Sequence, residues 1–315
     1  MLKYIAQRLV ALVGILFVVS LGSFLLARLL PGDIHAIILG QGDTPANRKI
    51  VDKLYGFNKS IFVQYWLWLK NALQGQLGYS YFTSTPVTTE ISNALPIDGE
   101  LILLSQIMAF AVAIPLALRC ARRPGGLLDR FASSSTFVLL SIPAFVIITE
   151  LVNLVAIQWG VPNTGLNVYS PYGNFWVNLT AMALPSLTLA IGSFVVYFRV
   201  LRSDLISTYQ EEFITMARSK GLSRRRIVWR HAFRPSSIAL LSTAGVNIGG
   251  LVAGTFIVEY ITGIPGMGKL IFTAIGSSDY VTLQGAVLVI ATIVILLNFM
   301  IDLSFGFIDP RITRD

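Results

Sequence analysis

Long runs of apolar residues recur along the chain, and polar segments separate them. The runs cover residues 10–27, 101–118, 131–157, 179–198, 238–258 and 283–307. Each is close in length to the ~20 mostly apolar residues that a helix needs to cross the hydrocarbon core of a bilayer. The pattern therefore predicts an all-α integral membrane protein with six spanning helices, the first of them an uncleaved helix within residues 1–30.

A long polar segment, residues 31–99, follows the first run. Thr44 and Pro45 predict a helix that starts with an N-cap and a first-position proline and stops at Gly56. Ser60 predicts the start of a second helix. Because the segment is too long to be a simple loop, we expect it to form a small cap outside the membrane.

The basic residues are unevenly divided between the polar segments. If both termini are cytoplasmic, the inner segments carry 17 of the 24 Lys and Arg residues, as the positive-inside rule requires. Residues 100–315 then form a five-helix core with a cytoplasmic loop at 202–235. This placement accounts for most of the net charge of +8, so the charge does not call for a nucleic-acid partner.

Residues suited to catalysis or metal binding are sparse. Cys120 is the single cysteine, so an intrachain disulfide is excluded. His35 and His231 are far apart in sequence and have no cysteine partners, which argues against a His/Cys metal site. We expect a chain with no catalytic residue, no metal and no bound cofactor.

The inner stretch 208–235 has the pattern of two short helices joined by a tight turn. Thr208 and Glu211 have the spacing of a capping box, and Gly221 stands where a left-handed C-terminal cap is expected. Four residues at helical spacing predict one apolar face: Tyr209, Phe213, Met216 and Ala217. A helix this short is marginal in water, which favours docking in a groove of another protein. A solvated connector whose arginines only fix topology is the alternative, and the residues alone leave both open.

Residues 263–270 match the G-x-x-x-x-G-K part of a phosphate-binding loop, but Leu270 replaces the Ser or Thr that holds Mg²⁺. The stretch falls on the outer side in the predicted topology, away from ATP. We therefore interpret it as a re-entrant turn after the fifth span.

Two sets of residues within the spans are candidates for a translocation pathway. Small residues in the fifth span allow close helix packing, and with the polar residue among them they form the first set: Gly245, Asn247, Gly249, Gly250 and Gly254. The second set is the pair of carboxylates, Glu150 and Asp302, since acids within a span face a bundle interior or water. We expect Asp302 to pair with Arg199 or Arg202. For Glu150, contact with a cationic substrate group and a neutral or paired glutamate between helices both remain open.

Several motifs together resemble the permeases of ABC importers of the peptide/nickel branch, in the subunit type with a long first outer segment. They are Pro31-Gly32-Asp33, Gln64-Tyr65, Gly75-Gln76-Leu77-Gly78-Tyr79-Ser80, Gly160-Val161-Pro162, Ala217-Arg218-Ser219-Lys220-Gly221-Leu222, His231-Ala232-Phe233-Arg234, Pro265-Gly266-Met267-Gly268-Lys269-Leu270 with Glu259, and Asp309-Pro310-Arg311. The resemblance covers nearly the whole chain and implies a type I importer permease fold.

The resemblance also implies that the inner loop carries the EAA motif, a coupling helix that docks on an ATPase subunit. Ala217 and Gly221 match the second alanine and the glycine of the motif, whereas Thr215 and Met216 replace its glutamate and first alanine. The coupling residues implied in this way are Glu211, Glu212, Phe213, Thr215, Met216, Ala217, Arg218, Lys220 and Gly221. The outer turn implied by the resemblance comprises Glu259, Pro265, Gly266 and Gly268.

The partners that the resemblance implies are a second, non-identical permease, two ATPases that hold ATP and Mg²⁺, and an extracytoplasmic solute-binding protein. The chain itself would lie in the bacterial inner membrane and import di- or oligopeptides. Nickel or another small solute is the alternative within this class. A secondary transporter without ATPases is the alternative from another class, for which broken helices in an inverted repeat would be typical.

Overall fold

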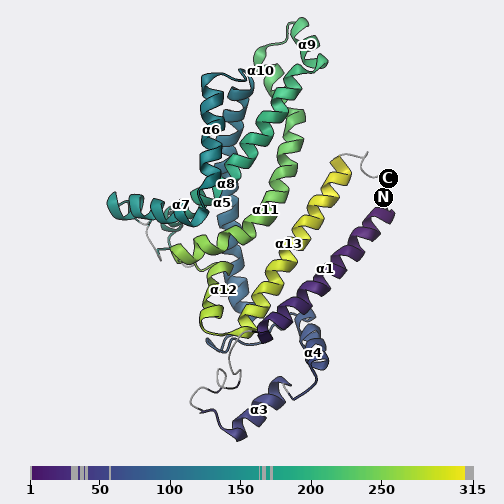
Figure 1. The fold of residues 1–315 in the computed structure, drawn as a ribbon, viewed down its shortest axis with the longest axis vertical. Coiled ribbons are helices and arrows are strands. Elements are labelled where there is room, and N and C mark those ends of the chain that lie inside the picture. Colours follow the sequence, from purple (N-terminus) through teal and green to yellow (C-terminus); the bar gives the residue numbers. More distant parts are fainter. Residues whose placement is uncertain are drawn as a thin grey trace. The chain divides into compact units, whose positions relative to one another are not determined.

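The computed structural model describes residues 2–29, 35, 39, 42–56, 58–162, 164, 168–170 and 173–308. Within these ranges the chain is helical, and its only β-pairing is an isolated bridge between Tyr79 and Pro86. The helices are α1 (Leu2–Leu29), α3 (Pro45–Tyr55), α4 (Ile61–Leu73), α5 (Val87–Ala121), α6 (Leu127–Ser141), α7 (Ala144–Leu151), η2 (Val152–Gln158), α8 (Phe175–Gln210), α9 (Glu212–Ser219), α10 (Arg224–Arg226), η3 (Ile227–Phe233), α11 (Arg234–Thr262), α12 (Met267–Gly276) and α13 (Tyr280–Ile308) (Figure 1).

Among the described residues, four helical stretches are long and apolar enough to cross a membrane: Val87–Ala121, Phe175–Gln210, Arg224–Thr262 and Tyr280–Ile301. A fifth span results if α6 and the α7–η2 pair are counted together. The apolar part of α1, Leu9–Leu25, is shorter than these four stretches and is not counted with them. The prediction of an all-α membrane protein is therefore confirmed, while the sixth span, the cytoplasmic termini and the outer cap stay predictions.

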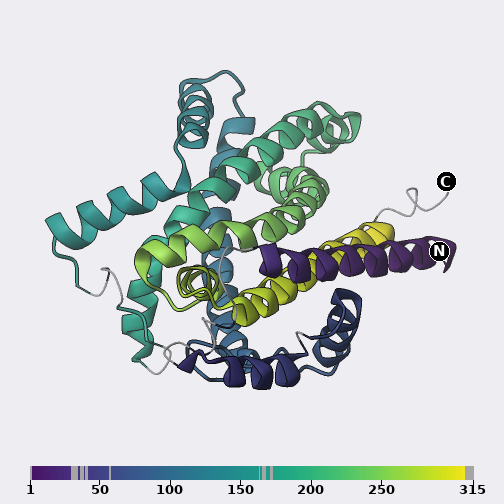
Figure 2. The same ribbon diagram turned by 60° about the horizontal axis from the view of Figure 1, so that its bottom comes forward.

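The predicted third span, residues 131–157, is not one straight helix. It bends by 97° between α6 and α7, and α7 and η2 extend away from α6 (Figures 1 and 2). The cause is Pro143, because the residue before a proline avoids helical geometry. Ile142 accordingly has extended dihedrals, φ −97° and ψ 119°, and ends α6.

The chain divides into two compact units. Unit 1 comprises residues 1–97, 265–306 and 310–315, and unit 2 comprises 98–264 and 307–309. The predicted division into 1–30, 31–99 and 100–315 describes placement relative to the membrane and stays a prediction. The motifs at 31–33 and 309–311 lie outside the described residues.

Unit 2 is organised around α8, which contacts α6, α7, α9 and α11. Large side chains of α8 are fully buried in its core: Tyr197, Phe198, Leu201 and Leu205. The neighbouring face of α5 is lined with buried small residues, among them Ala109, Ala113 and Ala117. Small side chains let spanning helices approach closely, so α5 supplies the space that the large α8 residues fill.

In unit 1, the two helices predicted in the outer segment form where expected. Thr44 caps α3 and accepts a hydrogen bond from the Asn47 amide, and Gly56 ends it with φ 71°. Ser60 is the N-cap of α4. Tyr65 of α4 packs edge-on against Phe24 of α1 and its hydroxyl lies 2.8 Å from Ser20 Oγ.

The segment between α4 and α5 is fixed to the start of α13 by buried hydrogen bonds. Ser80 Oγ donates to Asp279 Oδ2 at 2.5 Å, and Thr282 Oγ1 donates to the same oxygen at 2.9 Å. The backbone of Gly78 has φ 95°, and a Cβ added there would lie 2.7 Å from Val281 Cγ1. Only glycine suits both the dihedral and the close contact.

Gly78→Ala is expected to lower the stability of the chain by about 2–4 kcal/mol, from the left-handed backbone and the overpacking together. Gly75→Ala is the matched control, because Gly75 also has a positive φ (77°) but nothing lies within 4 Å of its added Cβ. Thermal unfolding of the detergent-purified complex measures both variants. Equal losses in the two variants would contradict the contact with Val281.

Candidate functional site: the inner loop and the polar groups of unit 2

The candidate coupling helix α9 begins later than the sequence predicts. α8 continues through Gln210, and Glu211 is the N-cap of α9 without a side-chain hydrogen bond. Thr208 therefore lies inside α8, and its Oγ1 is 3.1 Å from Ser236 Oγ at the start of α11. The predicted capping box of Thr208 and Glu211 is wrong, because Thr208 hydrogen-bonds to another helix instead of capping α9.

The turn at the end of α9 has the predicted geometry. Gly221 has φ 73°, its amide donates to the Arg218 carbonyl at 2.9 Å, and the Leu222 amide donates to the Ala217 carbonyl at 3.3 Å. These two bonds define a Schellman cap. The left-handed cap predicted at Gly221 is confirmed.

The apolar residues of α9 lie on two faces instead of one. Ile214 and Ala217 are buried in the unit 2 core, whereas Phe213 is 45% exposed and Met216 is 58% exposed. The predicted single face, which grouped Ala217 with Phe213 and Met216, is wrong. The buried pair, Ile214 and Ala217, attaches α9 to α8 and η3. The exposed pair, Phe213 and Met216, makes no such attachment.

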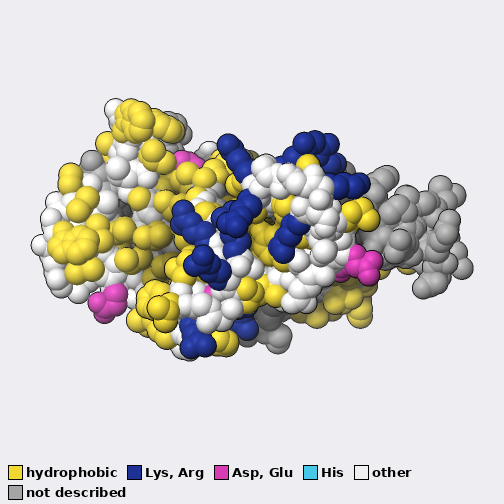
Figure 3. Space-filling model, turned by 90° about the horizontal axis from the view of Figure 1, so that it is seen from above, with side chains coloured by type: hydrophobic (Ala, Val, Ile, Leu, Met, Phe, Trp, Pro, Cys, Tyr) yellow, Lys and Arg dark blue, Asp and Glu magenta, His cyan; other side chains and the backbone are white. Residues whose placement is uncertain are grey.

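The remaining predicted coupling residues are exposed: Glu211, Glu212, Thr215, Arg218, Lys220 and Gly221. Lys and Arg side chains gather around α9 at this end of unit 2 (Figure 3). Exposed arginines come from both inner loops: Arg119, Arg122, Arg123 and Arg130 from the first, and Arg224, Arg225, Arg226, Arg230 and Arg234 from the second. This end therefore presents an apolar pair within a strongly basic surface.

A buried ion pair joins α6 to α8 just below this surface. Asp129 is 3% exposed and accepts two hydrogen bonds from the Arg202 guanidinium, one of them 2.6 Å from Nη2 to Oδ2. Asp129 also accepts from the Gly125 amide at 2.8 Å. Arg202 thus has a carboxylate partner within unit 2, and the predicted pairing of Asp302 with Arg199 or Arg202 stays a prediction. The side chain of Asp302 lies outside the described residues.

Asn247, a predicted pathway residue, belongs to a polar network between α5, α8 and α11. Its Nδ2 donates to Ser193 Oγ and to Tyr197 Oη, both at 2.9 Å. The Tyr197 hydroxyl donates to Gln106 Oε1 at 2.5 Å. Sequence reasoning missed Gln106, Ser193 and Tyr197, although a polar residue in each of three apolar runs is a recognisable sign of interhelical hydrogen bonding.

The glycines of α11 differ in their surroundings. Gly249 is buried and Gly245 is half-buried. A Cβ added at Gly254 would lie 3.8 Å from Leu189 of α8, whereas nothing lies within 4 Å of one added at Gly250. A Cβ at Gly254 would thus make only an ordinary van der Waals contact, and Gly250 is open among the described residues, so packing within this chain requires glycine at neither position.

Glu150 lies on α7 and its side chain is exposed in unit 2. At the other end of the fifth predicted span, Gly263 ends α11 with φ 74°, and Glu259 is fully buried. Gly266 is the N-cap of α12, which contains the buried Gly268. The stretch that matched a phosphate loop is thus a helix end, a turn through Pro265 and a helix start.

Comparison with known proteins identifies the family. Residues 113–314 match the binding-protein-dependent transport system inner membrane component family. Residues 1–102 match the N-terminal part of such membrane components. The chain belongs to this family. It is a transport subunit of the bacterial inner membrane, as the sequence predicts.

Relatives are similar over nearly their whole length. A di/tripeptide transport system permease of Pseudomonas aeruginosa is 31% identical, with 99% of both chains covered. A dipeptide transport system permease of Escherichia coli is 29% identical, with the same coverage. A nickel import system permease of Staphylococcus aureus is 30% identical over 98% of this chain and 92% of its own.

Breaking the Asp129–Arg202 pair is expected to destabilise unit 2. Arg202→Gln leaves the buried Asp129 carboxylate unpaired, at a cost of about 2–4 kcal/mol, whereas Asp129→Asn leaves the half-buried Arg202, which water reaches, and costs less. The double variant should lose less than the sum of the two single losses, because neither charge is then left alone. Thermal unfolding of all four proteins gives the coupling, and additive losses would contradict it.

Proposed function

We propose that the chain is the pathway-forming permease of an ATP-driven importer of di- and oligopeptides. In this proposal six helices span the membrane, with α1 as the first, and both termini are cytoplasmic. Residues 31–99 form an outer cap. Family membership supports the import role, and the names of the peptide permeases among the relatives support the substrate class.

The coupling role is supported mainly by one observation: α9 has one apolar face buried within the chain and a second apolar face exposed. Ile214 and Ala217 hold the helix to the chain, and Phe213 and Met216 project from it. An amphipathic helix with apolar anchors three residues apart suits a groove on a partner protein. The partner here is an ATPase subunit, and each of two permeases would engage one ATPase.

The contacts of α9 give the coupling a mechanical route. α9 contacts both α8 and η3, and α8 contacts η3 and α11. Since α8 and α11 belong to candidate spans, a force on α9 reaches two spanning helices at once. ATP and Mg²⁺ bind to the partner subunits, and this chain contributes no cofactor and no catalytic group. Binding of ATP below can then bias the two-state bundle above.

The pathway lies between this chain and a second, non-identical permease. Glu150 and Gly250 are the candidates with free surface. The other pathway candidates, Gly245, Gly249 and Asn247, are half-buried or buried and act through helix packing. An extracytoplasmic solute-binding protein delivers substrate to the outer turn of Glu259, Pro265, Gly266 and Gly268 and to the outer cap.

Growth of an amino-acid auxotroph on defined di- to pentapeptides tests the substrate class. Deletion of the gene should abolish growth on peptides and leave growth on free amino acids unchanged. Unchanged growth on peptides would refute the peptide assignment, and a loss of nickel uptake in the same strain would then support the nickel alternative. Peptide uptake by the purified chain alone in liposomes would instead indicate a secondary transporter.

Met216→Asp is expected to weaken the ATPase contact without harming the fold, because Met216 is exposed and a carboxylate cannot enter an apolar groove at low cost. ATPase retained on the purified permease and ATP-driven uptake should each fall by about tenfold or more. Ser223→Asp adds the same charge nearby at the N-cap of α10, where Asp is favoured. Equal ATPase retention in the two variants would contradict the role of Met216. Ala217 is unsuitable as a probe because it is buried within the chain.

A further inference from the structure

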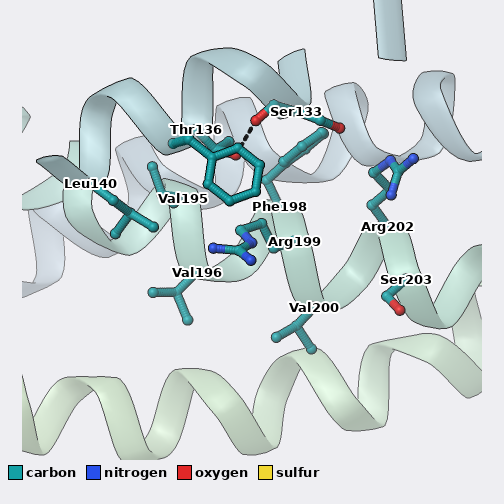
Figure 4. A pocket seen from close by; sticks show the side chains of 11 residues that line it. Ser133, Thr136, Leu140, Val195, Val196, Phe198, Arg199, Val200, Arg202 and Ser203 are labelled. Atoms are coloured by element: carbon teal, nitrogen blue, oxygen red, sulfur yellow. Dashed lines mark hydrogen bonds between the residues drawn. The ribbon is translucent and has the colours of Figure 1, made fainter. Parts of the chain in front are cut away.

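A groove of about 600 Å³ runs between α6 and α8, below the basic surface around α9. Figure 4 shows that residues of both helices line it, with Arg199 between them. Nothing in the proposed coupling or pathway roles uses this groove. Arg202, Ser203 and Ser133 lie toward one end of the groove, and Val196 and Leu140 lie toward the other. This arrangement favours a ligand with a charged part and an apolar part.

The polar end of the groove has donors available for an anion. The Arg199 guanidinium lies 4.9 Å from the centroid of the Phe137 ring, and it makes no ion pair with any residue that the structure describes. Ser133 Oγ is buried without a hydrogen-bond partner in the same part of the structure. Arg202, also on the groove, is already paired with Asp129. The exposed Arg199 guanidinium is thus the donor that a ligand in the groove can reach, since the Ser133 hydroxyl oxygen is buried.

The apolar end lies deeper in the candidate spans. Along α8 the accessible lining residues run from Ser203 and Arg202, past Val200 and Arg199, to Val196, whereas Val195 and Phe198 are fully buried. At a rise of 1.5 Å per residue, Ser203 and Val196 lie about 10 Å apart along the helix axis. On α6 the order is the same, from Ser133 near the inner loop to Leu140 farther into the span. Both walls therefore change polarity in the same direction.

We propose that an anionic phospholipid binds in this groove, with its phosphate on Arg199 and the start of an acyl chain along Val196 and Leu140. The guanidinium fork matches phosphate oxygens, and the Phe137 ring holds it in place by a cation–π contact. A phospholipid changes from charged to apolar along the membrane normal, as the groove does. A free anion would leave the apolar half of the groove unfilled.

The surface outside the groove is consistent with lipid contact. Val138 of α6, which does not line the groove, is 61% exposed, and the groove residue Phe137 beside it is 59% exposed. Binding itself requires only that unit 2 lies in a membrane. We place this lipid in the inner leaflet, and that placement additionally rests on the proposed orientation of the chain.

The test uses the complete transporter purified with its partner subunits in detergent. Native mass spectrometry measures retained phosphatidylglycerol, phosphatidylcholine with the same acyl chains, and inorganic phosphate. We expect phosphatidylglycerol to bind more tightly than the other two, and Arg199→Gln to weaken it about tenfold. Arg130→Gln is the matched control, since Arg130 is an exposed arginine of α6 outside the groove.

Three results would overturn the proposal. Equal binding of phosphatidylglycerol and phosphatidylcholine would exclude recognition of the charge. Equal losses in the Arg199→Gln and Arg130→Gln variants would exclude a specific site. Inorganic phosphate that binds as tightly as phosphatidylglycerol would make this a free-anion site.

A photo-reactive residue in place of Leu140 gives an independent measurement that leaves Arg199 intact. Irradiation of the assembled transporter in phosphatidylglycerol vesicles should attach lipid to this position. A cross-link to the second permease instead would mean that protein covers the groove, and it would refute the proposal. Neither result depends on transport activity, so a failure here is distinct from a failure of the peptide-importer proposal.

Discussion

The burial of Ile214 and Ala217 against α8 and η3 is the contact on which the inner loop depends. A helix of eight residues is not stable alone in water, so these two side chains supply the tertiary contact that α9 needs. The Schellman cap at Gly221 then fixes the direction in which the chain leaves α9 and enters η3. With its position fixed from both sides, α9 can transmit a displacement instead of yielding to it.

Two groups of polar side chains in unit 2 satisfy one another across helices, as a low-dielectric environment favours. Gln106, Ser193, Tyr197 and Asn247 bond across three helices, and Asp129 pairs with Arg202 at the end of two. These contacts fix the register of the helices more specifically than apolar packing does. Helices joined by such hydrogen bonds move together. This suits a permease in which a displacement of α9 at one end is passed on to the spanning helices.

The sequence predicted local features well because they depend on a few neighbouring residues. Thr44, Gly56 and Gly221 have the caps that their types and spacing indicate. Prediction from the sequence failed where a contact with a segment far away in the chain decides the local structure. Thr208 has capping chemistry but its hydroxyl lies beside that of Ser236, and the Asp129 partner of Arg202, which comes from another helix, was not foreseen. Helical spacing alone could not separate buried Ile214 from exposed Phe213, because the position of α8 and η3 chooses the face. The coupling and pathway assignments themselves still await experiment.

The bend at Ile142 and Pro143 has a consequence for the environment of unit 2. Where a helix stops, its last carbonyls lose their intrahelical donors, and lipid tails offer them no replacement. The Ile142 amide donates to the Leu139 carbonyl at 3.4 Å, which satisfies one of them. The other carbonyls need water or protein beside them, since hydrocarbon would cost several kcal/mol for each. At the corner between α6 and α7 these backbone oxygens therefore face water or protein, whatever covers the side chains of the same turn.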